Sequence, residues 1–182
     1  MRPTADSAFK IASAILSSPE FQNEISNMTF KCDSYCDGCK NIENANGRIS
    51  GGEVLSRLFK ESNVAITLDL RESGGPLGET SEGSYYTKAW YESIRSDMPE
   101  FNFSFAYGLA VNLCHEYMHQ VGFCHLYCTG YWPKCSKKYR LNEENHKPDP
   151  KFINDDVTYR VGWSAFYILK KWKEDGKNIF NN

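Results

Sequence analysis

Apolar residues recur every three or four positions in several stretches of the chain, a spacing typical of helices that bury one face. The longest stretch covers residues 103–121 and has an apolar stripe with a spacing of four: Leu109, Leu113, Tyr117 and Val121. Shorter helices are predicted over residues 7–16, where Pro19 stops the pattern, over 51–61 after the N-cap residue Ser50, and over 162–174. The last of these has an apolar face of four residues: Trp163, Phe166, Tyr167 and Leu169.

Alternation of apolar and polar residues predicts strands elsewhere. Val64–Leu70 has the sequence VAITLDL and Ser84–Trp90 has the sequence SYYTKAW, and both are rich in β-branched or aromatic residues. A further short strand is expected near Ile25–Phe30. The glycine-rich run SGGPLGETSEG is expected to form turns, and residues 123–155 are expected to be irregular. Strands that precede the two main helices indicate an α+β fold.

Composition and charge narrow the class of protein. Of 182 residues, 41% are hydrophobic and 14% aromatic, which suits one domain with a packed core and excludes a disordered chain. The 21 Lys and Arg side chains nearly balance 23 Asp and Glu, so the net charge of −2 provides no basic field for nucleic acid. No run of about 18 apolar residues predicts a membrane span. We therefore expect a single monomeric domain over residues 1–182.

Seven cysteines are more than a reducing compartment favours. Six of them form two groups of three: Cys32, Cys36 and Cys39, then Cys124, Cys128 and Cys135. Three disulfides between the groups, a second zinc site made of thiolates, and free thiols are the alternatives, and we favour disulfides because the spacings lack paired CxxC form. Cys114 is expected to stay reduced in the core. The cysteine content leads us to expect a secreted or extracytoplasmic protein whose export signal is absent from this chain.

The stretch HEYMHQVGFCH contains three of the four histidines of the chain. His115 and His119 are four apart on the predicted helix, so both rings project from the same face and can bind one metal ion. Gly122 can end the helix in a left-handed conformation and turn the chain back to deliver His125 as a third ligand. Three imidazoles and one open position are typical of a catalytic zinc site, at which Glu116 can act on the activated water as a general base.

This stretch fits the HExxHxxGxxH signature, and the chain therefore resembles the metzincin clan of zinc metallopeptidases. The resemblance implies a zincin-like core over residues 51–182, preceded by the cysteine-containing segment 1–50. It implies one zinc ion held by the three histidines, with Glu116 as general base. It also implies a substrate cleft bounded by an edge strand to which a peptide substrate adds as a further strand, and Ser84–Trp90 is our candidate for that edge.

The sequence departs from the metzincin pattern after the third histidine. Members of the clan have a methionine in a tight turn beneath the zinc, whereas this chain has no methionine after His125. In the stretch DDVTYRVG, Val157 is the residue that we align with the missing methionine, and Tyr159 follows two residues later. Astacin-like and serralysin-like members place a tyrosine there that can approach the zinc. The resemblance thus gives Tyr159 the role of fifth ligand or oxyanion donor, with simple packing beside the last helix as the alternative.

The sequence as a whole predicts a secreted zinc metalloendopeptidase that hydrolyses peptide bonds in a protein or peptide substrate. Two alternatives stay open: an inactive, zinc-holding binding protein on the same scaffold, and a zinc hydrolase of a non-peptide amide. The intact Glu116 favours an active enzyme, because a binding protein has no chemical need for the base. The substrate specificity and any inhibitory role of the N-terminal segment are left open.

Overall fold

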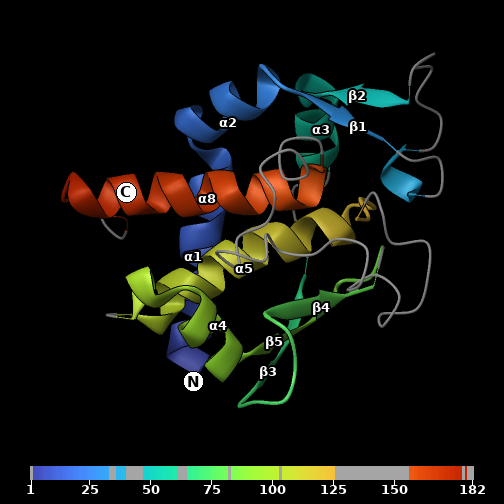
Figure 1. Ribbon diagram of the computed structural model, residues 1–182. Coiled ribbons are helices and arrows are strands. Elements are labelled where there is room, and N and C mark those ends of the chain that lie inside the picture. Colours follow the sequence, from blue (N-terminus) through green and yellow to red (C-terminus); the bar gives the residue numbers. More distant parts are fainter. Residues whose placement is uncertain are drawn as a thin grey trace, which may run out of the picture.

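The larger sheet lies at the bottom of the molecule, and most of the helices lie above it together with a smaller, two-stranded sheet (Figure 1). The computed structural model describes residues 2–32, 36–39, 47–60, 65–81, 83–102, 104–125, 156–177 and 179. The helices have these bounds: α1 Arg2–Ser17, α2 Pro19–Ser26, α3 Gly51–Leu58, α4 Tyr91–Asp97, α5 Phe105–Gln120 and α8 Val157–Glu174. The fold is α+β, as the order of predicted elements indicated.

Helix α5 forms the centre of the fold and packs against α1, α4 and α8. Its buried side chains point in all directions from the helix: Ala106, Leu109, Ala110, Val111, Asn112, Leu113, Cys114, Glu116, Met118, His119 and Gln120. A helix that is buried nearly all round belongs in the interior of a domain. The predicted stripe is therefore only part of the buried surface: Leu109 and Leu113 are buried, whereas Tyr117 and Val121 are partly exposed.

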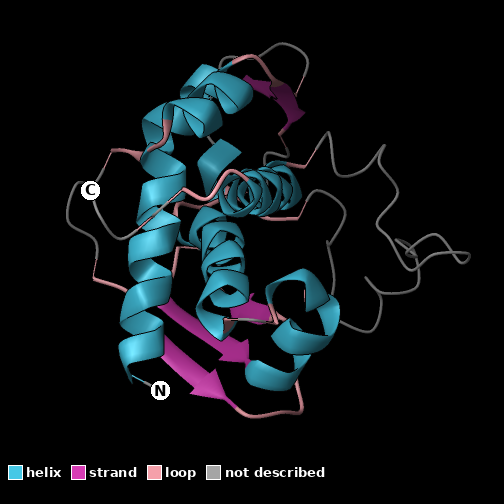
Figure 2. Cartoon of the chain, turned by 90° about the vertical axis from the view of Figure 1, so that its left-hand side faces the viewer, coloured by secondary structure: helices cyan, strands magenta, loops and turns pink. Residues whose placement is uncertain are grey.

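Helix α1 packs against α5, which it crosses at a steep angle, and belongs to the same core (Figure 2). Ala8, Ile11 and Ile15 are three and four positions apart and are fully buried. The Cys114 thiol of α5 lies 3.9 Å from the Ala12 carbonyl oxygen, which is one of the contacts between the two helices. The N-terminal helix therefore contributes directly to the core that holds α5.

Pro19 begins a helix rather than only ending the one before it, because a proline lacks an N–H that the first turn would leave unpaired. The preceding Ser18 is the N-cap, and its hydroxyl accepts a hydrogen bond of 3.2 Å from an amide of the first turn of α2. The strand expected near Ile25–Phe30 is consequently shorter than predicted and begins later in the chain. Helix α2 occupies its first part, and β1 (Thr29–Lys31) pairs antiparallel with β2 (Arg48–Ser50).

N-cap residues explain where two other helices begin. Ser50 caps α3 as predicted, with its hydroxyl 3.2 Å from an amide of the first turn. Helix α8 begins at Val157 rather than at residue 162, because Asp156 caps it by accepting a hydrogen bond of 3.1 Å from the Tyr159 amide. The stretch that we aligned with the metzincin turn is thus the first part of the last helix.

The larger sheet has three strands in the order β3 (Thr67–Arg71), β5 (Tyr86–Trp90) and β4 (Gly78–Thr80). Strand β3 is parallel to β5, and β4 is antiparallel to it. Helix α5 packs on both β4 and β5, so it lies between the other helices and the sheet.

The expectation that Ser84–Trp90 is the edge strand over the site is wrong, because β5 is the central strand of this sheet. The edge beside α5 is β4, which comes from the glycine-rich run predicted as turn. Its pattern is too short to be recognised as a strand, and pairing with β5 stabilises it. The Thr80 and Thr87 hydroxyls, for example, lie 2.8 Å apart across the two strands.

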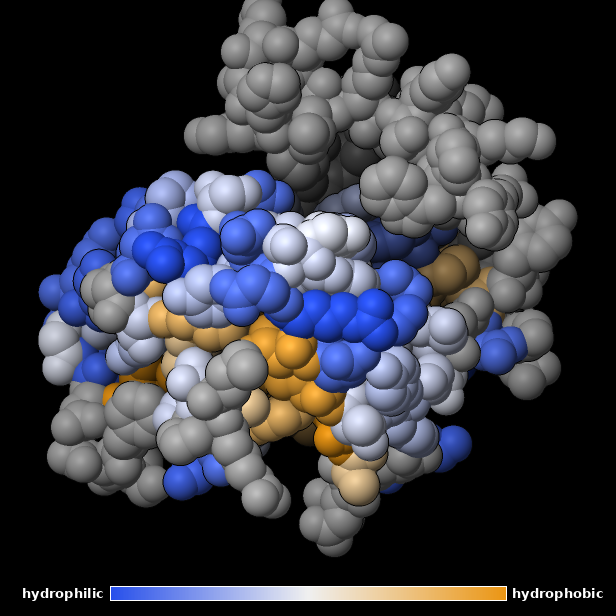
Figure 3. Space-filling model, turned by 90° about the horizontal axis from the view of Figure 1, so that it is seen from below, coloured by the Kyte–Doolittle hydropathy of each residue, from blue (hydrophilic) through white to orange (hydrophobic). Residues whose placement is uncertain are grey.

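Seen from below, the molecule shows hydrophilic residues around an exposed apolar strip (Figure 3). Ion pairs on the sheet join Arg71 to Asp69 and Lys88 to Glu79, with nitrogen–oxygen distances of 2.7 and 2.9 Å. Within the described residues, no helix has the length and apolar character needed to cross a membrane.

Candidate metal centre

Three histidine side chains converge where α5 ends. His115 and His119 lie one turn apart on α5, and His125 follows in the irregular segment after the helix. One ring nitrogen of each lies within 4.8 Å of those of the other two. The ring centroids are 5.2 Å apart for His115 with His119 and with His125, and 4.7 Å apart for His119 with His125. This arrangement can hold one metal ion, as the spacing in the sequence indicated.

The chain turns back toward α5 at Gly122, whose φ of 92° is in the left-handed region that favours glycine. The Gly122 amide donates to the His119 carbonyl at 3.0 Å, and the Phe123 amide donates to the Met118 carbonyl at 2.9 Å. These two bonds form a Schellman motif, a common way to end a helix. Phe123 is buried, and the turn therefore directs the following residues, His125 included, over the end of the helix.

The backbone fixes which nitrogen of His119 faces the metal position. Nδ1 lies 2.7 Å from the Phe123 carbonyl oxygen, and a carbonyl can only accept, so Nδ1 holds the proton and Nε2 is free to bind a metal. Burial lowers the pKa of His119 to about 4, and His125 adds to the effect. Burial, His119 and His125 also lower the pKa of His115. Both rings are therefore neutral at pH 7, the form that ligates metals.

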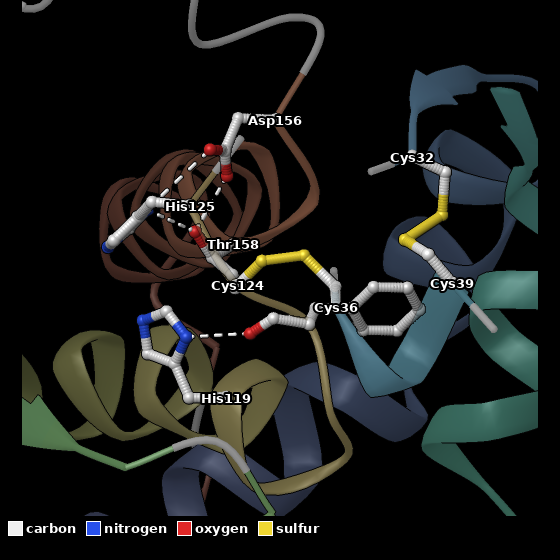
Figure 4. The surroundings of a disulfide bond; sticks show 9 residues. Cys32, Cys36, Cys39, His119, Cys124, His125, Asp156 and Thr158 are labelled. Atoms are coloured by element: carbon white, nitrogen blue, oxygen red, sulfur yellow. Dashed lines mark hydrogen bonds and ion pairs between the residues drawn. A yellow bond between two sulfur atoms is a disulfide. The ribbon is translucent and has the colours of Figure 1, made fainter. Parts of the chain in front are cut away.

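Two residues of the α8 N-terminus orient His125 (Figure 4). The Thr158 hydroxyl donates to the Asp156 carboxylate at 2.6 Å, so it accepts from Nδ1 of His125 at 2.8 Å. The carboxylate itself lies 3.5 Å from the same nitrogen. Burial alone raises the pKa of Asp156, but hydrogen bonds and the charge of His125, together with Thr158 and Tyr159, lower it to about 2. The carboxylate is thus ionised and holds the His125 ring with its other nitrogen free.

Asp156 and Thr158 were not among the predicted site residues. The only available signal was an aspartate before a helical pattern, which is a typical N-cap residue. That signal predicts the start of a helix and says nothing of a histidine 31 positions upstream of the aspartate.

Glu116 directly follows His115 on α5 and is 3% exposed. Burial raises its pKa to about 7, although the Thr80 hydroxyl and His125 act in the opposite direction. Its Oε2 atom has no hydrogen-bond partner among the residues that the structure describes. Glu116 is not one of the residues whose donor atoms converge on the metal position. It is a buried carboxyl group, and one of its oxygens lacks a hydrogen-bond partner within the described part of the chain.

Strand β4 covers Glu116 with a glycine. A Cβ atom at Gly78 would overlap the Glu116 carboxylate and would lie 2.7 Å from Nδ2 of Asn112. Only glycine therefore allows the edge strand to lie this close to the helix that bears Glu116.

Tyr159 lies beside the metal position in the first turn of α8. Its ring stacks on His125 with a centroid distance of 4.5 Å and an interplanar angle of 28°, and its centroid is 5.4 Å from that of His115. The residue as a whole is 40% exposed. Burial and the charge of Asp156 raise the pKa of Tyr159 to about 12, which keeps the hydroxyl protonated and able to donate. Val157, aligned with the missing methionine, is buried.

Two disulfides lie on one side of the site (Figure 4). Cys36–Cys124 joins the two cysteine groups, as expected, whereas Cys32–Cys39 lies within the first group and contradicts the expectation that all pairs join the groups. Cys128 and Cys135 lie outside the described residues. Cys114 is a buried free thiol, as predicted, and burial raises its pKa. The disulfides are compatible with an extracellular protein.

No family model matches the chain, and no match is found among the curated proteins or among the solved structures. The metzincin resemblance therefore depends on the residues of the motif alone. The structure supports a coarser statement, that an α+β fold brings three histidines into an arrangement able to hold a metal ion.

Proposed function

We propose that this protein is a zinc-dependent metalloendopeptidase of metzincin type. The observation that supports it best is the joint placement of three imidazoles and a buried carboxylate. His115, His119 and His125 converge, and Glu116 lies beside them without joining the ligand set. Catalytic zinc sites combine three protein ligands with a free position, whereas structural zinc sites use four.

The donor chemistry fits zinc. All three candidate ligands are imidazoles, and the hydrogen bonds of His119 and His125 leave Nε2 free in both rings. When bound, the ion would polarise a carbonyl group and make water a nucleophile near neutral pH. The unpartnered Oε2 of Glu116 offers an acceptor for the proton of such a water molecule.

The roles of the chain's own residues follow from their positions. Glu116 has a pKa of about 7, so at neutral pH it can take a proton from water and release it to the leaving amine. Tyr159 keeps its proton and can donate a hydrogen bond to the oxyanion. On the side away from β5, strand β4 pairs with no other strand of the described chain, and an extended peptide can add there, directly above Glu116. The disulfides support a secreted or extracytoplasmic location.

The test is cleavage of a diverse peptide library, read by mass spectrometry, together with the zinc content of each sample. Glu116→Gln should retain zinc and lower turnover by roughly a hundred- to ten-thousandfold, because it removes the base while keeping the shape. His115→Ala should lose both zinc and turnover. Glu92→Gln, on the exposed surface of α4, is the matched control and should cleave like the native chain.

The outcomes of this experiment distinguish the peptidase proposal from its alternatives. Cleavage that survives Glu116→Gln contradicts the general-base assignment. Bound zinc with no cleavage of any peptide by the native chain overturns the peptidase proposal and favours a zinc-holding binding protein or a hydrolase of non-peptide amides.

A further inference from the structure

A short N-terminal loop contacts the segment that bears the third histidine, although the two are far apart in the sequence. The loop contains the 3₁₀ helix η1 (Asp37–Cys39). Cys36, just before η1, forms a disulfide with Cys124, which lies 88 positions further along the chain and directly precedes His125. The bridge is therefore adjacent in sequence to a candidate metal ligand.

A backbone contact accompanies the disulfide. The Gly38 amide donates to the Gly122 carbonyl oxygen at 2.7 Å. A Cβ atom at Gly38 would lie 2.9 Å from the carbonyl carbon and oxygen of Gly122, and one at Gly122 would lie 2.8 Å from the Gly38 nitrogen. The two glycines thus bring the loop and the turn into direct backbone contact, with no space for a side chain between them.

The contacted turn affects two of the three candidate ligands. It includes Phe123, whose carbonyl oxygen fixes the ring of His119, and it leads directly to His125. His125 belongs to no helix or strand, so tertiary contacts must define its position. Asp156, Thr158 and Tyr159 supply such contacts from the start of α8, and the loop around Cys36 supplies another through Cys124.

We propose that the Cys36–Cys124 disulfide and the Gly38–Gly122 contact form a clamp that positions His125 and the Phe123 carbonyl, so that metal affinity depends on the oxidation state of this bridge. A dithiol reductant gives two electrons and two protons to the bridge, which becomes two thiols, and the reductant becomes its own disulfide. This inference rests on the metal centre of the proposed function, and adds that the N-terminal loop controls it.

The second disulfide provides a matched control. Cys32–Cys39 closes the same loop on itself, with a sequence separation of 7, and neither of its cysteines is bonded to the turn after α5. Breaking it removes a disulfide from the same part of the molecule without cutting the covalent link to Cys124.

The experiment measures zinc affinity by competition with a chelating dye, on the full chain, with circular dichroism as a check of folding. Cys36→Ser/Cys124→Ser should weaken zinc binding by roughly ten- to a hundredfold, the effect typical of losing a contact that orients a ligand. Cys32→Ser/Cys39→Ser should bind zinc nearly as the native chain does. Because each variant replaces both cysteines of a pair, no free thiol is left behind that could bind zinc itself.

A second variant keeps every cysteine. Gly38→Ala forces the loop away from Gly122 and should weaken zinc binding in the same direction while the bridge remains closed. If Cys36→Ser/Cys124→Ser fails to fold, the zinc affinity of Gly38→Ala still tests whether the clamp positions the ligands.

Three outcomes would overturn the inference. Unchanged affinity in both Cys36→Ser/Cys124→Ser and Gly38→Ala would show that the clamp positions nothing. Equal weakening by both cysteine pairs would indicate a general loss of structure rather than positioning. A native oxidised chain that binds no zinc would refute the metal centre and the clamp together, which distinguishes that failure from the first two.

Discussion

The Thr158 hydroxyl oxygen lies 2.8 Å from Nδ1 of His125, although the two residues are 33 positions apart in the chain. The same hydroxyl donates to Asp156, which caps helix α8. The start of the last helix and the orientation of the third candidate ligand therefore depend on the same two side chains.

Removing the Thr158 hydroxyl should weaken metal binding without unfolding the protein. Thr158→Val keeps the shape of the side chain but leaves Nδ1 of His125 without its acceptor, so we expect zinc affinity to fall roughly tenfold or more. Thr67→Val, at an exposed position of β3, is the control. Zinc titration of both variants checks this, and equal affinities would show that the hydroxyl does not orient the ring.

Asp156 has two roles that substitutions can separate. Asp156→Asn keeps a side chain that caps helices well but removes the charge, so it should mainly weaken zinc binding. Asp156→Ala also removes the cap and should lower the free energy of unfolding by a further amount of about 1 kcal/mol. Chemical denaturation of the metal-free variants measures the stability difference. If Asp156→Asn and Asp156→Ala lower the free energy of unfolding equally, Asp156 does not stabilise the protein as a helix cap.

A side chain on β4 should interfere with Glu116 rather than with the metal. In Gly78→Ala the new methyl group overlaps the Glu116 carboxylate, so we expect strongly reduced turnover with zinc still bound. Gly52→Ala, in α3, meets only the Ser50 hydroxyl at 4.0 Å and should leave both properties unchanged. Metal analysis and peptide cleavage on the same samples distinguish the two effects, and normal turnover by Gly78→Ala would place the strand further from the base than the structure does.

Glu116 should make the metal-free protein less stable as the pH rises. Its pKa is about 7 in the folded chain against an ordinary value of 4.5, so between these values the folded state binds the proton more tightly than the unfolded state. The stabilisation is complete below about pH 4.5 and is lost as the pH rises through 7.

The comparison that tests this uses Glu116→Gln, which has no titrating group at that position. In the presence of chelator, Glu116→Gln should gain stability relative to the native chain between pH 5 and pH 8, by an amount on the order of 3 kcal/mol. Denaturant unfolding at the two pH values measures it. A stability difference that does not change with pH would show that the carboxyl group titrates normally.

Metal removal should lower the unfolding temperature of the native chain. At a zinc concentration about a hundred times the dissociation constant, binding stabilises the folded state by about 2.7 kcal/mol, which corresponds to roughly 5–10 °C for a chain of this size. Glu116→Ala should keep this shift, and His115→Ala should lose it. Thermal scans with and without chelator give the answer, and a full shift in His115→Ala would exclude His115 as a ligand.

Helices α1, α3, α5 and α8 and the candidate ligands were predictable because they depend on local spacing, whereas α2 and α4 were not predicted. The four-residue spacing of His115 and His119 and the turn at Gly122 are properties of a single helix and its end. Apolar periodicity was less reliable at the surface, where Tyr167 belongs to the predicted apolar face of the last helix but is 56% exposed.

The features that the sequence did not predict depend on contacts between distant segments. Strand β4 has three residues and exists because it pairs with β5, and the particular pairing of Cys36 with Cys124 joins segments 88 positions apart. Asp156 and Thr158 acquire their relation to His125 only when α8 packs on α5. Such relations have no periodicity and no fixed spacing, so a single sequence does not reveal them.

Two of the three candidate ligands belong to α5, a helix that is buried nearly all round, and the third belongs to the segment after it. Unfolding α5 would disrupt the core. His115 and His119 should therefore leave their positions only when the whole domain unfolds. His125 can leave its place by a local movement. The rates at which a metal ion enters and escapes should therefore be set by the motion of a single side chain and its turn, while the other two ligands stay fixed as a preformed half of the site.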